Sequence, residues 1–125
     1  MKILLIDDDA FLRDMYATKF SECNHEVQSV DHADKAVQIL EEGKKFDVLL
    51  IDMVMPGMSG IEFLQKVQTD NLCADTLCIV LSNQGQQADI DEAVAAGAHA
   101  YIIKAENVPS EVVEKVEKIV AEHKK

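Results

Sequence analysis

Short apolar runs alternate along the chain with segments in which apolar side chains recur every three or four residues. The last segment shows the helical spacing well, with Val112, Val113 and Val116 among exposed Glu and Lys. This alternation predicts an α/β protein with a parallel sheet. Strands are predicted at residues 2–7, 26–30, 46–52, 77–82 and 100–104, and helices at 10–23, 33–42, 59–69, 86–96 and from 109 onward.

Right-handed crossovers between such strands predict an open, doubly wound sheet of five parallel strands with helices on both faces. The expected strand order is 2-1-3-4-5, the order of flavodoxin-like (βα)5 folds. Residues 1–125 are expected to form one domain, because the chain is long enough for one core and too short for two. In this order the first and third strands are neighbours, and the ligand crevice lies beyond their carboxyl ends.

The net charge of the chain limits the kinds of molecule that it is expected to bind. Asp and Glu total 23 against 12 Lys and Arg, which gives a net charge of -11. A surface this acidic repels phosphate backbones and anionic lipid, so direct nucleic-acid binding is not expected. No apolar stretch approaches the roughly 20 residues of a membrane span, so no membrane insertion is expected. We expect a cytoplasmic protein.

Cys23, Cys73 and Cys78 are an odd set without a Cys-x-x-Cys pair. This argues against a disulfide framework and against a zinc site. Buried or incidental thiols are expected.

Acidic residues stand at the ends of the first and third predicted strands, as Asp7, Asp8 and Asp52. Clustered carboxylates repel one another unless a cation lies among them, and all-oxygen ligation favours Mg²⁺. Such an ion takes a substrate phosphate as a further ligand, so Asp52 could act as the nucleophile in phosphoryl transfer. Lys104, at the end of the fifth strand, would neutralise the phosphoryl oxygens, and Ser82, closing the fourth, could donate its hydroxyl to one of them.

At these residues the sequence resembles the response-regulator receiver domains of two-component signalling, and most closely the single-domain, chemotaxis-regulator-like members. The motifs that carry the resemblance are LLIDD at 4–8, LIDMVMPGMSG at 50–60, VLS at 80–82 and YIIK at 101–104. Together they cover essentially the whole chain.

The resemblance implies a regulator, not an enzyme with its own substrate, that assists its own Mg²⁺-dependent phosphorylation and dephosphorylation. Asp52 would accept a phosphoryl group from the phosphohistidine of a sensor histidine kinase or phosphotransfer protein in a phosphorelay. Asp8 and Asp52 would bind Mg²⁺ directly, Asp7 through water, and the backbone carbonyl of Val54 would complete the protein ligands.

The resemblance also assigns the residues that would sense the phosphoryl group. Lys104 would pair with the aspartate before transfer and with the phosphoryl oxygens afterwards. Ser82 is similar to the family's hydroxyl switch residue, and Tyr101 resembles its aromatic companion. The surface that binds a downstream target protein would comprise the fourth helix, the fifth strand and the fifth helix. A homodimer through the same face is left open.

Two positions depart from the family pattern. Asn83 follows the switch hydroxyl, where a small residue is usual. Ala105 follows Lys104, where the family usually has a proline in a cis peptide. Because a non-proline cis peptide costs about 2.5 to 4 kcal/mol, either that strain is tolerated here or the peptide is trans.

Two other functions are compatible with parts of the pattern. Asp7 and Asp9 form an Asp-x-Asp pair after a strand, as in haloacid-dehalogenase-type phosphohydrolases, although Ala10 and Phe11 fit that family poorly. Alternatively, the chain is a non-phosphorylated interaction module that keeps the receiver fold. We expect Asp9 to cap the first helix, since a carboxylate there accepts from free backbone N–H groups.

Overall fold

The computed structural model describes residues 1–123, in which five parallel strands form one sheet in the order β2-β1-β3-β4-β5. The strands are β1 (Lys2–Ile6), β2 (Glu26–Val30), β3 (Val48–Ile51), β4 (Leu77–Ser82) and β5 (Ala100–Ile103). The helices are α1 (Ala10–Glu22), α2 (Ala33–Glu41), α3 (Gly60–Thr69), α4 (Gln87–Ala96), the 3-10 helix η1 (Lys104–Glu106) and α5 (Pro109–His123). The predicted fold class and strand order are confirmed.

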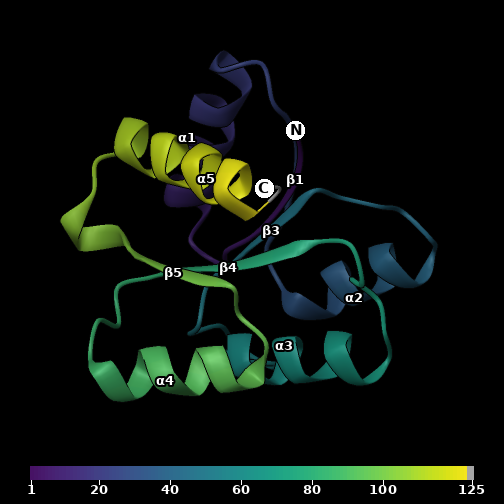
Figure 1. The fold of residues 1–125 in the computed structure, drawn as a ribbon. Helices are drawn as coiled ribbons and strands as arrows, with labels where there is room; N and C mark the ends of the chain where they lie inside the picture. The colour runs from purple at the N-terminus through teal and green to yellow at the C-terminus, as the bar shows by residue number, and fades with distance from the viewer. Residues whose placement is uncertain (124–125) are drawn as a thin grey trace.

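The sheet lies between two layers of helices, with α1 and α5 on one face and α2, α3 and α4 on the other (Figure 1). Successive strand residues face opposite layers. Ile3 therefore packs in the cluster that contains Phe20 of α1, while Leu4 packs in the cluster that contains Phe63 of α3. Because both faces are buried, the central strands are apolar throughout, which is why they appear as continuous runs in the sequence.

Three strands end one residue earlier than predicted where they approach the candidate site, the first of them at Ile6, whereas the fourth ends at Ser82 as predicted. The third strand ends at Ile51 and the fifth at Ile103, so Asp52 and Lys104 lie just beyond the regular ladder. Lys104 begins η1, and Nδ2 of the Asn107 side chain donates to the Ile103 carbonyl at 2.7 Å, which closes this turn. The Lys104–Ala105 peptide is trans, which decides between the two alternatives that the sequence left open.

The start of α1 follows its predicted signal. Asp9 caps α1, since its side chain accepts from the Leu12 amide at 3.0 Å. Gly97 ends α4 in the left-handed conformation, with φ of 118°, which glycine adopts without steric cost. These local signals fix where the chain turns between strand and helix, and so where the strand ends open to solvent.

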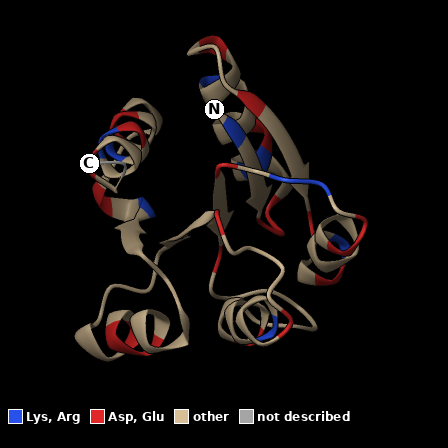
Figure 2. Ribbon diagram, turned by 45° about the vertical axis from the view of Figure 1, so that its right-hand side comes forward, with Lys and Arg blue, Asp and Glu red and all other residues tan. Residues whose placement is uncertain are grey.

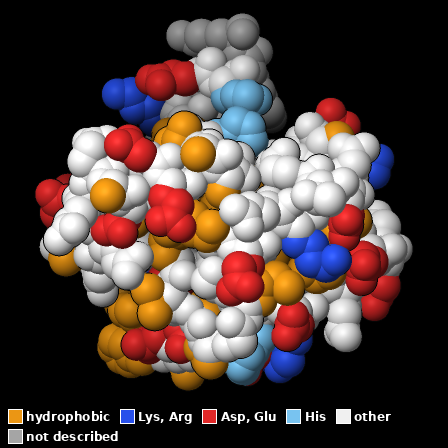
Figure 3. Space-filling model, turned by 90° about the horizontal axis from the view of Figure 1, so that it is seen from below, with side chains coloured by type: hydrophobic (Ala, Val, Ile, Leu, Met, Phe, Trp, Pro, Cys, Tyr) orange, Lys and Arg blue, Asp and Glu red, His pale blue; other side chains and the backbone are white. Residues whose placement is uncertain are grey.

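Acidic residues outnumber basic ones on the helices taken together, most clearly on α4, which has no Lys or Arg (Figure 2). On the face formed by α3 and α4 they are spread among small apolar patches, and basic side chains are few (Figure 3). Within residues 1–123, none of the helices has both the length and the apolar character required to cross a lipid bilayer.

Candidate functional site

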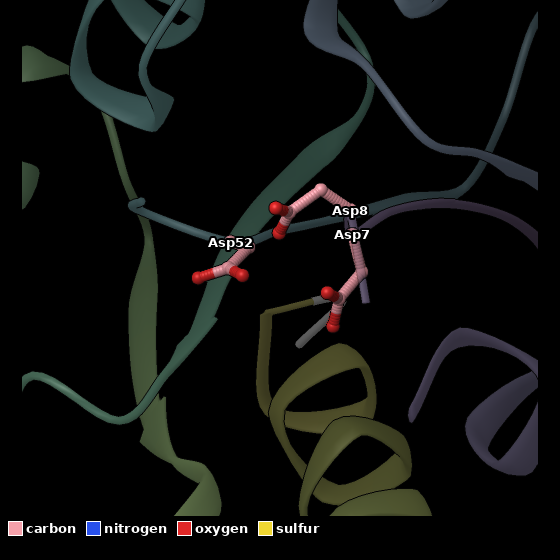
Figure 4. A group of neighbouring side chains, drawn as sticks. All are labelled: Asp7, Asp8 and Asp52. Atoms are coloured by element: carbon pink, nitrogen blue, oxygen red, sulfur yellow. The ribbon is translucent and has the colours of Figure 1, made fainter. Parts of the chain in front are cut away.

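Three carboxylates converge at the carboxyl edge of the sheet. The register pairs Ile6 of β1 with Ile51 of β3, so the residues that follow, Asp7 and Asp52, leave the sheet side by side. The Asp52 amide donates to the Ile6 carbonyl at 3.0 Å. One oxygen atom each of Asp7, Asp8 and Asp52 lies within 4.8 Å of the others (Figure 4). The structure thus brings together the three acids that the sequence singled out.

Lys104 reaches this cluster from the end of β5. Its Nζ donates to Oδ2 of Asp7 at 2.7 Å and to Oδ2 of Asp52 at 3.4 Å. The side chain of Lys104 is 6% exposed, that of Asp7 1% and that of Asp52 12%. Pairing with Asp52 was predicted, whereas the shorter contact with Asp7 was not. The ammonium group is therefore a buried cation shared by two carboxylates.

Burial and charge alter the acidity of two of these groups. Burial raises the pKa of Asp52, against the opposing effect of the Lys104 charge. Burial by itself would lower the pKa of Lys104, but its hydrogen bond to Asp7 and the charges of Asp52 and Asp7 outweigh burial and raise that pKa. Lys104 is therefore held in its charged form, and Asp52 is a more basic carboxylate than an exposed aspartate.

The donor set suits a hard divalent cation. Three carboxylates against one ammonium leave an excess of negative charge, and every candidate ligand atom is an oxygen, as Mg²⁺ prefers. The Val54 amide donates to Oδ1 of Asp52 at 3.3 Å, so the backbone of Val54 lies against the Asp52 carboxylate. Coordination by the Val54 carbonyl stays a prediction.

Ser82 and Tyr101 are connected through the backbone of Gln84. Ser82 ends β4, is 1% exposed, and its Oγ accepts from the Gln84 amide at 3.3 Å. The Tyr101 hydroxyl donates to the Gln84 carbonyl at 2.5 Å. Burial raises the pKa of Tyr101, so the phenol stays protonated and able to donate at neutral pH. The switch roles of both residues stay predictions, but a physical connection between them is present.

Two residues support the site in ways that the sequence did not predict, although one of them, Gly60, belongs to the motif at 50–60. Arg13 of α1 donates from Nη1 to the Asp7 carbonyl at 2.8 Å and so holds the turn that carries the first two acids. Gly60 begins α3, and its amide donates to the Met53 carbonyl at 3.0 Å. The sequence held a signal for this close packing. The first residue of a helix needs no left-handed conformation, so a glycine there indicates that the position has no room for a side chain.

Gly60 allows α3 to touch the loop that carries Asp52. A Cβ at this position would lie 2.5 Å from the Asp52 carbonyl oxygen and 2.8 Å from Cα of Met53, both of them backbone atoms. Gly60→Ala is therefore expected to reduce the free energy of unfolding by about 2 kcal/mol, as overpacking does. Urea denaturation measures this loss.

Gly85→Ala is the matched control, because the added Cβ would be tight only against the terminal Cδ1 of the Ile103 side chain, at 3.0 Å, and at ordinary contact distance from the rest of that side chain. That methyl group can move away, so the control is expected to lose less than about 1 kcal/mol. Equal losses in the two variants would contradict the assigned role of Gly60.

The chain matches a family model described as response regulator receiver domain over residues 3–117. A chemotaxis protein CheY homolog of Campylobacter jejuni is 30% identical over 105 residues, which are 83% of this chain and 81% of that protein. The two-component response regulator PhoP of Pseudomonas aeruginosa is 33% identical over 104 residues, which are 83% of this chain and 45% of that longer protein.

Solved structures agree with these sequence matches. The crystal structure of a CheY-like response regulator receiver domain protein from Methanospirillum hungatei is 26% identical, with a TM-score of 0.87 over 98% of this chain and 95% of that one. The receiver domain of the Francisella response regulator 1452 shares the fold, with a TM-score of 0.85 and 24% identity over 98% of each chain.

Proposed function

The chain belongs to the response regulator receiver family, and from this premise we propose that Asp52 is the residue that accepts the phosphoryl group. Members of the family are regulators in two-component signalling, which receive a phosphoryl group from a histidine kinase or phosphotransfer protein and act on downstream targets. The identity of the acceptor and of its supporting residues in this chain is our proposal, as is a cytoplasmic location.

The observation that carries the proposal is the difference in exposure among the three acids. Asp7 is close to Lys104 but only 1% exposed, so an incoming donor cannot reach it. Asp8 is exposed, but among residues 1–123 it forms no ion pair. Asp52 is the one acid of the three that is both partly open to solvent and within 3.4 Å of a cation.

In the proposed reaction an oxygen of the Asp52 carboxylate attacks the phosphorus of a phosphohistidine. The new P–O bond gives an acyl phosphate, while the P–N bond breaks and its electron pair returns to the imidazole of the donor. Lys104, already at Asp52, would then face a phosphoryl oxygen, and Ser82 could donate its hydroxyl to another. Mg²⁺, held by Asp8 and Asp52 with Asp7 through water, would neutralise charge on the transferring group.

The same geometry suggests how the phosphoryl group would be sensed. Movement of the Ser82 hydroxyl toward the phosphoryl group would disturb its contact with the Gln84 amide, and Gln84 is in turn bound by Tyr101 of β5. We propose that α4, β5 and α5 form the surface that a downstream protein reads. Val94 of α4, which is 54% exposed, lies within this surface.

Neither alternative gains support from the comparisons. A haloacid-dehalogenase-type phosphohydrolase would require Asp9 as a free acid, but the Asp9 side chain caps α1. An experiment distinguishes a non-phosphorylated interaction module from the proposed phosphoacceptor, because such a module would take up no phosphoryl group.

Incubation with acetyl phosphate and Mg²⁺ tests the proposal. We expect the intact mass to rise by one phosphoryl group, and excess EDTA to prevent the increase, because Asp52 attacks poorly while the acidic cluster lacks its cation. Borohydride reduction followed by peptide mapping should locate the modification at Asp52. Labelling that is unchanged by EDTA or maps to another residue would refute the proposal. No labelling would favour the interaction module, and turnover of a generic phosphate ester with Asp9 essential would favour the phosphohydrolase.

A further inference from the structure

Two of the three cysteine thiols lie next to each other at the amino end of β4. Cys73 is in the loop between α3 and β4, and Cys78 is the second residue of the strand. Their Sγ atoms are 3.7 Å apart and form a hydrogen bond, and both residues are buried, 8% and 0% exposed. Cys23, by contrast, is exposed. The fold thus places two free thiols in contact, in a region that the phosphoryl chemistry does not use.

We propose that Cys73 and Cys78 are a redox modification site, at which a peroxide converts the two thiols into a reversible disulfide. In the first step the Cys73 thiolate attacks one oxygen of the peroxide, the O–O bond breaks, and a sulfenic acid forms with release of hydroxide or alkoxide. In the second step the Cys78 thiol attacks the Cys73 sulfur, and the S–O bond breaks to release water. Two electrons pass from the thiols to the peroxide.

The surroundings of the two thiols indicate which sulfur is oxidised first and which one then attacks the sulfenic acid. The loop around Cys73 is at the surface, with Ala74 and Asp75 exposed, so a small oxidant reaches Cys73 first. The hydrogen bond between the two sulfurs lowers the pKa of Cys73, while the same bond and burial raise the pKa of Cys78. Cys73 is therefore the sulfur that is oxidised, and Cys78 the sulfur that resolves the sulfenic acid.

The local backbone permits the bond to form. A disulfide requires an S–S distance of about 2.05 Å, so the sulfurs must approach by roughly 1.7 Å from their separation of 3.7 Å. Cys78 is held in the ladder opposite Leu49, and its amide donates to Nδ1 of His99 at 3.0 Å. Cys73 lies outside the regular elements, so the adjustment falls on its loop.

This inference does not rest on the proposed phosphoryl transfer. Cys78 is near the start of β4 and Ser82 is at its end, and four residues of strand span about 13 Å. The disulfide would join the α3–β4 loop to β4 near the amino ends of the strands, whereas the acidic cluster lies at their carboxyl ends. Oxidised protein is therefore expected to keep its capacity for labelling by acetyl phosphate.

The experiment uses the full chain treated with hydrogen peroxide and then alkylated under denaturing conditions. We expect the folded protein to lose the mass of two hydrogen atoms and to take up one alkyl group, at Cys23, in place of three. A sample reduced with dithiothreitol before alkylation should take up three alkyl groups. Cys23→Ser should show the same loss of two hydrogens and then take up no alkyl group. Cys73→Ser, and independently Cys78→Ala, should abolish the loss.

Circular dichroism shows whether each cysteine variant is folded, and the two substitutions at different positions guard against one of them failing to fold. The proposal is overturned if folded protein forms only dimers through Cys23, or if Cys73 accumulates as sulfinic acid without a cross-link. It is also overturned if all three thiols of the folded protein stay reduced at a peroxide concentration that forms disulfides in the protein unfolded by urea.

Discussion

Replacing Asp52 with asparagine is expected to abolish Mg²⁺-dependent labelling by acetyl phosphate, with a loss of at least about 100-fold. Asparagine keeps the shape of the side chain, but its amide cannot form an acyl phosphate. The measurement is the intact mass after incubation with acetyl phosphate and Mg²⁺. Asp75→Asn is the matched control, because it removes the same charge from an exposed position at the opposite edge of the sheet, and it should label like the native chain.

Stability measurements distinguish loss of the acceptor from loss of the fold. Because the pKa of Asp52 is raised in the folded state, the folded chain binds this proton more tightly than the unfolded chain does. The ionised carboxylate therefore destabilises the fold above the folded-state pKa, and this cost disappears below the unfolded-state pKa of about 3.9. Asp52→Asn should thus increase the free energy of unfolding at neutral pH without Mg²⁺, and the increase should shrink toward pH 3.

Equal labelling of the native chain and Asp52→Asn would remove Asp52 from the central role. Loss of labelling together with a loss of stability at neutral pH would also count against the argument, since it would attribute the defect to the fold. Only loss of labelling in a variant at least as stable as the native chain supports Asp52 as the acceptor.

The convergence of the acids could be predicted because it depends on topology alone. Each acid follows a strand, the strands are parallel, and the order 2-1-3-4-5 makes β1 and β3 neighbours. No side-chain detail is needed to bring Asp7 and Asp52 to one edge. The same reasoning placed Lys104 and Ser82 there, because β4 and β5 end at that edge too.

The distances within the site could not be predicted from the pattern. Whether Lys104 contacts Asp7 or Asp52 more closely depends on where β5 ends and on the rotamers of three side chains. The approach of Gly60 to the Asp52 carbonyl and the contact between Cys73 and the strand likewise arise from how α3 and its loops pack on the sheet. Periodicity reports which face a residue is on, but it does not report which atoms touch.

Lys104→Met is expected to lower the free energy of unfolding by about 3 kcal/mol at neutral pH without Mg²⁺, as removal of one partner of a buried ion pair does. Methionine fills a similar volume, so the loss would come from charge. Asp7 and Asp52, 1% and 12% exposed, would be left as neighbouring carboxylates without their cation. The pKa of Asp52 would rise further without the Lys104 charge, so the loss should be greatest at neutral pH and should diminish as the pH falls. Urea denaturation at several pH values measures this.

Three comparisons decide whether the charge of Lys104 holds the acidic cluster together. Lys66→Met removes an exposed lysine that is 2.8 Å from Asp70, and it should cost far less stability than Lys104→Met, because solvent screens an exposed ion pair. Adding Asp7→Asn to Lys104→Met should recover much of the loss, because the most deeply buried unpaired carboxylate is then neutral. Mg²⁺ should stabilise Lys104→Met more than the native chain, because the cation then replaces the missing ammonium charge. A cost for Lys104→Met no larger than that for Lys66→Met, without any gain from Mg²⁺, would show that the carboxylates tolerate one another without a cation.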